Sequence, residues 1–153
     1  MLVEAIYISP SHIFFGHHGE PAGTAPMIRV PRVECLAGRG LAGDRFLDYR
    51  PDYKGQVTFF SREVYEDLCE RFGVYGQDPS VFRRNLLVSG ADLNALIGER
   101  FTLQGIAFEG TDEARPCHWM NQAFHEGAEE AMRGRGGLRA RILDNGFLQE
   151  NAA

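Results

Sequence analysis

The sequence predicts one domain over residues 1–153 that is mainly β, a mostly antiparallel β-barrel with a few peripheral α-helices. Three observations support this fold class. The length and the 44% hydrophobic content are those of a single globular domain. About seven short runs have strand character, whereas two segments have the pattern of a substantial helix. The strand-helix-strand alternation that builds parallel sheets is rare in the chain.

The N-terminal part contains two predicted strands separated by a loop. Residues 2–9 form a short apolar run that turn residues close, and residues 27–35 alternate between apolar and polar side chains. Because Pro31 lacks an amide N–H, the second run is expected to be an edge or bulged strand. Residues 12–26 contain glycine and proline and are expected to form an irregular loop that overhangs a site.

The middle of the chain is expected to supply a strand, a helix and another strand. Residues 56–60 favour a strand, and Ser61 has the position of the N-cap of a helix that Gly73 ends. Asp78 followed by proline has the signature of a short helical turn, which leads into a strand over residues 86–88.

The C-terminal part is expected to form a helical turn, two hairpins and a second helix. The turn covers residues 93–97, and the first hairpin covers residues 101–108. Pro116 has the position of the first residue of a helix whose apolar side continues to Ala128. Residues 138–148 have the pattern of a second hairpin that turns at an Asn-Gly pair.

Charge and composition exclude several classes of function. A formal net charge of −5 argues against broad electrostatic binding to nucleic acid or to an anionic membrane. No apolar run approaches the roughly 20 residues of a membrane-spanning helix, and the N-terminus lacks the basic region of a secretory signal, so a cytoplasmic location is expected. Lys54 is the only lysine, and hence the only candidate for a pyridoxal-phosphate Schiff base.

Cysteine and histidine spacing gives no recognisable zinc site. Cys35, Cys69 and Cys117 lack the C-x-x-C spacing and cannot all pair within one chain. No two histidines have the i, i+4 spacing of a zinc helix. His17 and His18 could line the mouth of a pocket or donate a proton, or they could be polar loop residues without a role.

A glycine-rich loop over residues 38–45 is the first candidate site. It ends in Gly43-Asp44-Arg45, and its exposed amide N–H groups suit an anionic ligand. The Gly-Lys-Ser/Thr ending of a P-loop is absent. The alternative is a structural turn in which Asp44 and Arg45 form a local ion pair.

The second candidate is Arg83-Arg84-Asn85, which lies between a helical turn and a strand. Two guanidinium groups and an amide can bind a phosphate and recognise the polar edge of a ring. The alternative is that the two arginines point to opposite faces, one exposed and one paired with an acid. The basic run over residues 133–141 is equally compatible with a phosphate clamp and with a solvated turn.

The third candidate is Arg115-Pro116-Cys117. The predicted helix places the Cys117 thiol in its first turn beside a guanidinium, and both the helix amides and the cation favour the thiolate. A thiolate is a nucleophile, a sulfur carrier or a soft metal ligand. The alternative is a buried, unreactive cysteine, which is the preferred interpretation for Cys35 and Cys69.

The order and spacing of these motifs resemble the MOSC family, which is named for the C-terminal domain of molybdenum-cofactor sulfurase. The resemblance covers most of the chain. Phe46 departs from it, because the family loop often has histidine at that position. The matching segments are residues 40–45 (GLAGDR), 56–57 (QV), 82–90 (FRRNLLVSG), 96–101 (LIGERF), 115–117 (RPC) and 137–143 (GLRARIL).

The resemblance implies a β-barrel that binds the molybdenum cofactor, a pterin phosphate with a dithiolene-bound metal. It implies that Cys117 ligates molybdenum in an oxidoreductase that acts on N-oxygenated compounds and receives electrons from a partner. In the sulfurase branch the same cysteine would carry sulfur from a cysteine desulfurase, and a non-enzymatic cofactor-binding module is a third alternative. Pyridoxal phosphate belongs to a separate sulfurase domain and is not expected here. The expected cofactor-binding residues are Gly43, Asp44, Arg45, Arg83, Arg84, Asn85, Arg115 and Cys117.

Overall fold

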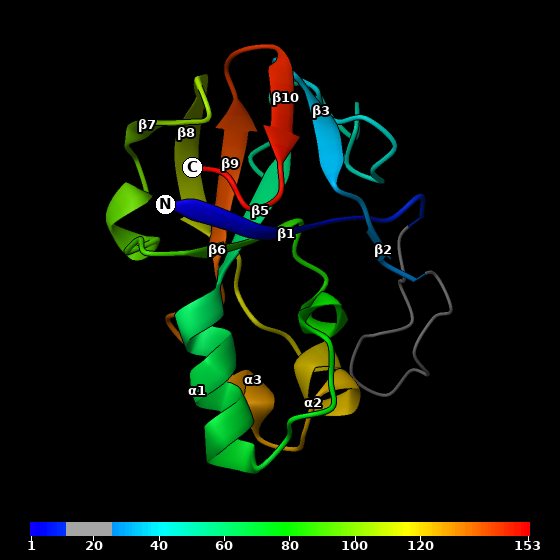
Figure 1. Cartoon of the computed structure of the whole chain (residues 1–153), viewed down its shortest axis with the longest axis vertical. Coiled ribbons are helices and arrows are strands. Elements are labelled where there is room, and N and C mark those ends of the chain that lie inside the picture. Colours follow the sequence, from blue (N-terminus) through cyan, green and yellow to red (C-terminus); the bar gives the residue numbers. More distant parts are fainter. Residues whose placement is uncertain (12–25) are drawn as a thin grey trace.

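The computed structural model describes residues 1–11 and 26–153. Its strands form two sheets, and the three α-helices of the described residues lie at one end of the molecule (Figure 1). The loop predicted over residues 12–26, with His17 and His18, lies outside the described residues except for Pro26.

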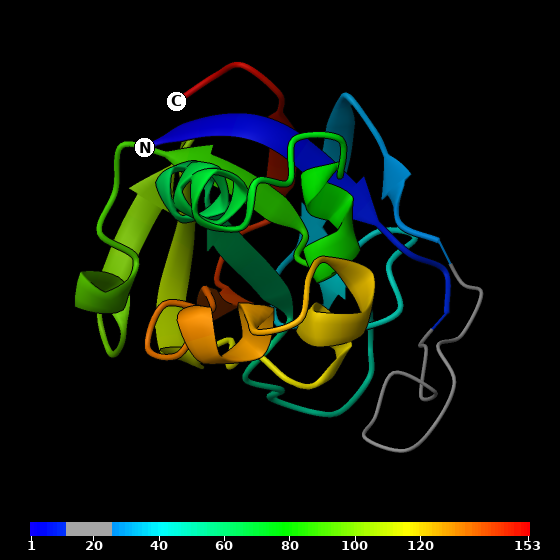
Figure 2. The same cartoon turned by 90° about the horizontal axis from the view of Figure 1, so that it is seen from below.

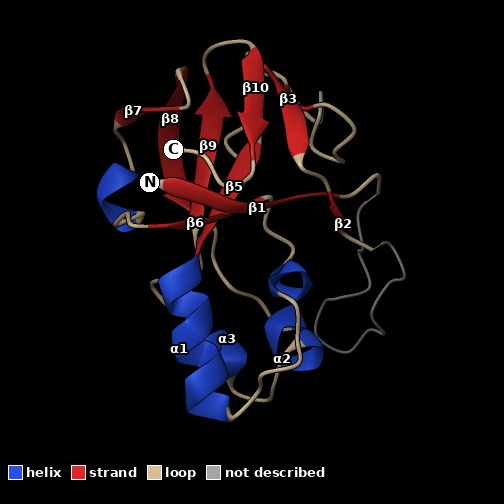
Figure 3. Ribbon diagram, in the orientation of Figure 1, coloured by secondary structure: helices blue, strands red, loops and turns tan. Residues whose placement is uncertain are grey.

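The larger sheet has seven strands in the order β2-β1-β6-β5-β9-β8-β7, and the smaller has three in the order β10-β3-β4 (Figure 3). The strands of the larger sheet are β1 (Leu2–Ile8), β2 (Ile28–Arg29), β5 (Val57–Ser61), β6 (Leu86–Ser89), β7 (Arg100–Leu103), β8 (Ile106–Glu113) and β9 (Leu138–Ile142). Those of the smaller sheet are β3 (Arg32–Leu36), β4 (Gly40–Leu41) and β10 (Gly146–Gln149). The helices are α1 (Arg62–Phe72), α2 (Trp119–Ala123), α3 (Ala128–Ala131) and the short 3₁₀ helices η2 (Pro79–Phe82) and η3 (Asn94–Leu96).

The named strands pair antiparallel except for β5 with β6. Those two are parallel because α1 and η2 carry the chain back across the sheet between them, which is the crossover that a parallel pair requires. The prediction of a mainly β, mostly antiparallel fold with a few helices is therefore confirmed.

The closed barrel of the prediction is not found among the described strands. β2 and β7 are the edges of the larger sheet, and the smaller sheet is not hydrogen-bonded to it as a continuation. The two sheets share one hydrophobic core instead, to which Val33 and Leu148 of the smaller sheet and Phe59 and Ile142 of the larger sheet belong. Two sheets packed face to face bury their apolar sides without closing a cylinder.

The central strands are buried on both faces. In β5, Val57 and Phe59 belong to the core between the sheets, whereas Phe60 belongs to a second core with Leu68 of α1 and Phe124 after α2. Figure 2 shows this helical end of the molecule from below. Because successive side chains of a strand point to opposite faces, β5 is fixed from both sides.

The caps of α1 and η2 are those predicted from the sequence. The side chain of Ser61 accepts a hydrogen bond from the amide of Val64, and Gly73 ends α1 with a φ of 66°. The Asp78 side chain accepts one from the amide of Ser80 and so caps η2. This turn brings the chain to β6 in the predicted way.

The predicted strand over residues 27–35 is divided in two at Pro31. β2 pairs with β1 in the larger sheet, whereas β3 pairs with β10 and β4 in the smaller sheet. The proline cannot donate a ladder hydrogen bond, so the chain leaves one sheet and enters the other at this residue.

The second predicted helix is wrong in its extent. α2 and α3 replace one continuous helix, because residues 124–127 leave the helical path and Gly127 has a φ of 95°. α2 begins at Trp119, so Cys117 precedes the helix and does not lie in its first turn.

The predicted hairpin over residues 138–148 is also wrong. β9 pairs with β5 and β8, whereas β10 pairs with β3 in the other sheet. Asn145 accepts a hydrogen bond from the amide of Ala37 at 2.8 Å. The Asn-Gly pair therefore turns the chain from one sheet to the other.

Candidate functional site

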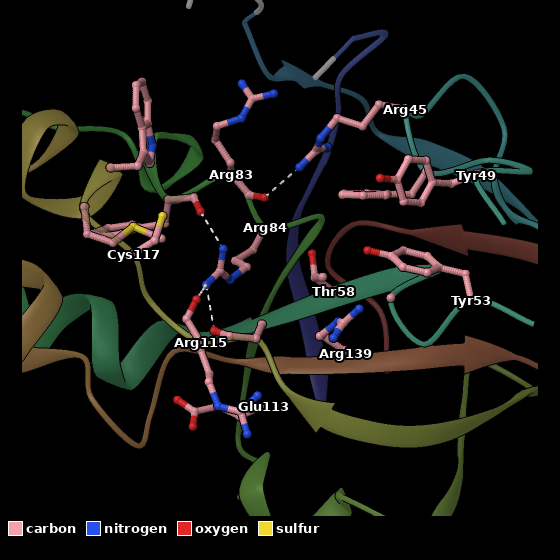
Figure 4. Close-up of a pocket in the computed structure, with 16 residues that line it drawn as sticks. Arg45, Tyr49, Tyr53, Thr58, Arg83, Arg84, Glu113, Arg115, Cys117 and Arg139 are labelled. Carbon is pink, nitrogen blue, oxygen red and sulfur yellow. Dashed lines mark hydrogen bonds between the residues drawn. The ribbon is translucent and has the colours of Figure 1, made fainter. Parts of the chain in front are cut away.

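A cavity of about 450 Å³ lies where the 44–55 loop, the η2–β6 junction, the segment before α2 and strand β9 meet (Figure 4). Cys117 lies at one end of the view and Tyr49 and Tyr53 at the other. The cavity is lined by Arg45, Phe46, Tyr49, Tyr53, Gly55, Thr58, Phe82, Arg83, Arg84, Glu113, Ala114, Arg115, Cys117, Trp119, Met120 and Arg139.

Five of the eight predicted site residues line this cavity. They come from three separate segments of the sequence: Arg45, then Arg83 and Arg84, then Arg115 and Cys117. The fold therefore brings the three candidate motifs to one place. With Arg139, five arginines line the cavity together with one carboxylate side chain, so an acidic chain presents a cationic cavity to an anionic ligand.

Asp44 lies beneath the cavity. Its carboxylate accepts hydrogen bonds from the amides of Ser9 and Phe46 at 3.0 and 3.2 Å, and from the Asn85 side chain at 3.3 Å. It also pairs with the Arg45 guanidinium at 3.1 Å, and neither side chain is more than 7% exposed. Asp44 therefore fixes Arg45 from behind.

Asn85 is also buried and directs its side chain into the protein. Its amide donates to the Tyr7 carbonyl at 3.1 Å, and its Oδ1 accepts from the amide and the hydroxyl of Thr58 at 3.0 and 3.1 Å. These contacts join β1, β5 and β6 below the cavity. The structure thus places Asn85 as a support of the site and not in its lining.

Gly43 gives the turn that positions Asp44 and Arg45. Its φ is +83°, and a Cβ at this position would lie 3.2 Å from Ile8. The amide of Asp44 donates to the Leu41 carbonyl at 3.1 Å. A left-handed residue pressed against β1 favours glycine, so Gly43 shapes the loop without lining the cavity.

Arg83 has a left-handed backbone, with φ 57° and ψ 36°. Its carbonyl accepts from Arg45 at 3.1 Å, and its guanidinium donates to Ser9 Oγ and to the Ser11 carbonyl, each at 3.3 Å. Burial, together with the charge of Arg45, lowers the pKa of Arg83 to about 10. Because the positive charges of Arg45 and Arg83 repel each other, an anion bound between them would be favoured.

Arg84 has most of its donors occupied by backbone carbonyls. The guanidinium nitrogens donate to the carbonyls of Gly136 and Phe82 at 3.0 and 3.1 Å, and to those of Ala114 and Arg115 at 2.7 and 3.3 Å. Burial lowers the pKa of Arg84 to about 10. Its guanidinium therefore clamps the segment before α2, which carries Cys117, to the end of β6.

Cys117 is the one exposed cysteine of the chain, whereas Cys35 and Cys69 are buried. Its carbonyl accepts from the amide of Met120 at 3.0 Å, which fixes the backbone at the start of α2. The neighbouring Arg115 pairs with Asp112 at 3.0 Å on the rim. Because Cys117 is exposed and lines the cavity, its thiol is accessible from the cavity.

Sequence reasoning missed an aromatic wall, and it named Arg139 only as part of the basic run over residues 133–141, with a phosphate clamp and a solvated turn as equal alternatives. Phe46 and Tyr53 stack with ring centroids 5.5 Å apart, and Tyr49 meets Tyr53 edge-on at 4.9 Å. No motif or periodicity in this loop marks the three rings. Alternation in β9 could have distinguished Arg139 within that run, because Leu138 and Ala140 on either side of it belong to the core.

No group of three or more histidine, cysteine, aspartate or glutamate side chains is arranged to hold a metal ion in the described part of the chain. No helix in residues 1–11 or 26–153 is long and apolar enough to cross a membrane.

Solved structures show the same fold. YuaD from Bacillus subtilis superposes with a TM-score of 0.74 at 18% identity, over 97% of this chain and 91% of that chain. YiiM from Geobacillus stearothermophilus gives 0.69 at 15% identity, over 99% and 72%, and YiiM from Escherichia coli gives 0.64 at 18%, over 94% and 66%. No curated protein matches significantly by sequence.

The family follows from the sequence itself. A profile of the MOSC domain matches residues 17–152, which contain all of the cavity-lining residues. The fold, the cationic cavity and this match agree: the chain belongs to the MOSC domain family, which is associated with the molybdenum cofactor.

Proposed function

We propose that this chain binds the molybdenum cofactor in the arginine-lined cavity, with the Cys117 thiolate as a ligand of the metal, and that it is an oxidoreductase acting on N-oxygenated compounds. The observation that carries the proposal is the exposed Cys117 thiol in the wall of a cavity lined by five arginines. Guanidinium groups suit the cofactor's phosphate, and a soft thiolate suits a molybdenum centre.

The residues of the chain divide into groups that face the ligand and groups that support them. Arg45 and Arg83 supply positive charge to the cavity. Asp44, to which Asn85 donates a hydrogen bond, holds Arg45 from below, and Arg45 in turn donates to the Arg83 carbonyl. Arg84 holds the backbone segment that leads to Cys117. When bound, the cofactor supplies a metal that changes oxidation state by two electrons and exchanges an oxygen atom.

The test is the metal content of protein made in a host that synthesises the cofactor. We expect molybdenum in the wild type and a large loss in Cys117→Ser, measured by mass spectrometry of the metal. Cys69→Ala is the matched control, because Cys69 is buried in the second core, away from the cavity lining. Equal molybdenum in wild type and Cys117→Ser would refute the ligand role of the thiolate.

The exposure of Cys117 also favours a second function, a persulfide carrier supplied by a cysteine desulfurase. In this reaction the Cys117 thiolate attacks the outer sulfur of the donor persulfide, the donor's S–S bond breaks, and the donor cysteine leaves as a thiolate. Intact mass spectrometry would then show one added sulfur in the wild type and none in Cys117→Ser. Absence of the added sulfur in the wild type would contradict this function.

The same variants distinguish a non-enzymatic binding module. Such a module would retain the cofactor in Cys117→Ser and lack reductase activity in either form. An oxidoreductase would in addition need an electron-transfer partner, so electron uptake from a reductase separates the first proposal from this one. A cytoplasmic location remains a prediction.

A further inference from the structure

We propose that Arg139 is the main anion anchor of the cavity, and that the ligand it selects is a phosphate monoester on a flat conjugated ring, with the ring against the aromatic wall of Phe46, Tyr49 and Tyr53. The inference rests on the proposed function and deepens it, because a pterin phosphate belongs to this ligand class, but its test needs neither a metal nor Cys117. It assigns to Arg139 the leading part in anion binding, which the sequence motifs suggested for Arg83 and Arg84 together.

Arg139 differs from the other four arginines of the cavity in what its side chain contacts. Arg45 and Arg83 bind protein oxygens, and Arg115 pairs with Asp112. Arg84 donates to four backbone carbonyls. The half-buried Arg139 side chain makes no hydrogen bond or ion pair with the residues that the structure describes, so its guanidinium donors face the cavity. A guanidinium offers five N–H donors in a fork that matches phosphate oxygens.

The sheet explains why Arg139 points into the cavity. Leu138 and Ala140, its neighbours on β9, are fully buried in the core between the sheets, so alternation directs Arg139 to the other face. Arg141 shares that face but pairs with Asp52 at 2.9 Å and Glu109 at 3.2 Å. Arg141 is therefore neutralised, whereas Arg139, two positions before it on the same strand, is available to a ligand.

The guanidinium of Arg139 is oriented without occupying its donors. Its Cζ lies 5.3 Å from the ring centroid of Tyr53, within the range of a cation-π contact. A Cβ added at Gly55 would lie 2.9 Å from Arg139 Nε, so the glycine leaves the room that the guanidinium occupies. A cation held in place before the ligand arrives loses less side-chain entropy on binding.

The aromatic wall indicates the rest of the ligand. Phe46, Tyr49 and Tyr53 line the cavity next to Arg139, and Arg45 lies over the Phe46 ring at 4.7 Å. Flat apolar surface beside a forked cation suits a conjugated ring that carries an anionic group. An isolated inorganic anion has no apolar surface with which to contact this wall.

The test measures binding to the chain purified without cofactor. The probes are 4-methylumbelliferyl phosphate, 4-methylumbelliferone, which has the same ring without phosphate, and inorganic phosphate alone. We expect the phosphate ester to bind most tightly, and Arg139→Gln to weaken the ester about tenfold or more while changing the affinity for 4-methylumbelliferone less than about twofold. Arg141→Gln is the matched control on the same strand and face, with an expected change below about twofold.

A second variant keeps the positive charge of Arg139 and moves its guanidinium group. Gly55→Ala is expected to weaken the ester several-fold, because the new methyl group displaces the Arg139 guanidinium. Thermal melting verifies that each variant is folded.

Three results would overturn the inference. They are an unchanged ester affinity in Arg139→Gln, an equal loss in Arg141→Gln, and binding of inorganic phosphate as tight as that of the ester. The binding assay does not depend on molybdenum, so a wild type that retains no metal would refute the proposed function and leave this result unaffected.

Discussion

Replacing Asp44 with asparagine tests whether the buried ion pair beneath the cavity stabilises the domain. The Asp44 side chain is fully buried, and that of its partner Arg45 is 7% exposed. The carboxylate accepts hydrogen bonds from Ser9, Phe46 and Asn85 as well as from Arg45. Asparagine has one acceptor oxygen in place of two and no charge, so the buried guanidinium loses its counter-ion.

The expected loss of stability is large. Removing one partner of a buried pair costs about 3–5 kcal/mol. In a domain of this size about 1 kcal/mol corresponds to roughly 2–4 °C, so we expect Asp44→Asn to lower Tm by roughly 6–20 °C in differential scanning calorimetry. The loss is a large part of the roughly 5–15 kcal/mol that stabilises a typical domain.

The matched control is Asp48→Asn in the same loop. Asp48 pairs with Arg39 at 2.7 Å, but both side chains are 53% exposed, so water already solvates the two charges. Its φ of 56° is one that asparagine also adopts readily. Tm of this variant should stay near that of the wild type. Equal shifts in the two variants, or a shift below about 2 °C in Asp44→Asn, would refute the reasoning.

Three further predictions follow from burial, charge and close backbone contact. Iodoacetamide at pH 8 should label Cys117 rapidly and alone, because Cys35 is buried and its pKa is raised to about 12; rapid double labelling in intact-mass spectra would contradict this. A hydrogen bond from Arg135 lowers the pKa of Asp67, so this pair stabilises the fold above about pH 4 and loses its effect as the pH falls through the lowered pKa. In urea titrations the free energy of unfolding of the wild type should exceed that of Asp67→Asn at pH 6 and equal it near pH 2. A difference that does not change with pH would exclude the linkage. Gly137→Ala should lower Tm by several degrees, because its Cβ would lie 2.2 Å from the Phe59 carbonyl oxygen at a φ of +120°; an unchanged Tm would show that the backbone adapts.

Local chemistry explains the elements that were predicted correctly. Ser61 and Gly73 mark the ends of α1 because a hydroxyl caps free amides and glycine adopts the left-handed φ. The hairpin of β7 and β8 turns at Gln104 and Gly105, which both have positive φ as the turn requires. These effects act between residues close in sequence, so the sequence alone reveals them.

Partner choice between distant segments accounts for the incorrect predictions. An Asn-Gly pair at 145–146 gives a hairpin by local rules, but β10 buries Leu148 against the other sheet and pairs with β3. The helix after Pro116 is broken because residues 124–127 change direction at Gly127. Sequence patterns record neither the identity of a strand's partner nor the end of a packing surface.

The candidate site shows the same division. Residue chemistry and local periodicity predicted the family, the cationic and thiol residue types, and the strands and helical turn next to them, because these properties depend on residues close in sequence. Their roles depend on contacts between distant segments, which the sequence does not show. The tertiary structure joins Arg45, Arg83 and Cys117 in one cavity, occupies the donors of Arg84 with carbonyls and leaves Arg139 in the cavity lining. Hydrogen bonds and burial between distant segments decide which charges are neutralised inside the protein and which remain available.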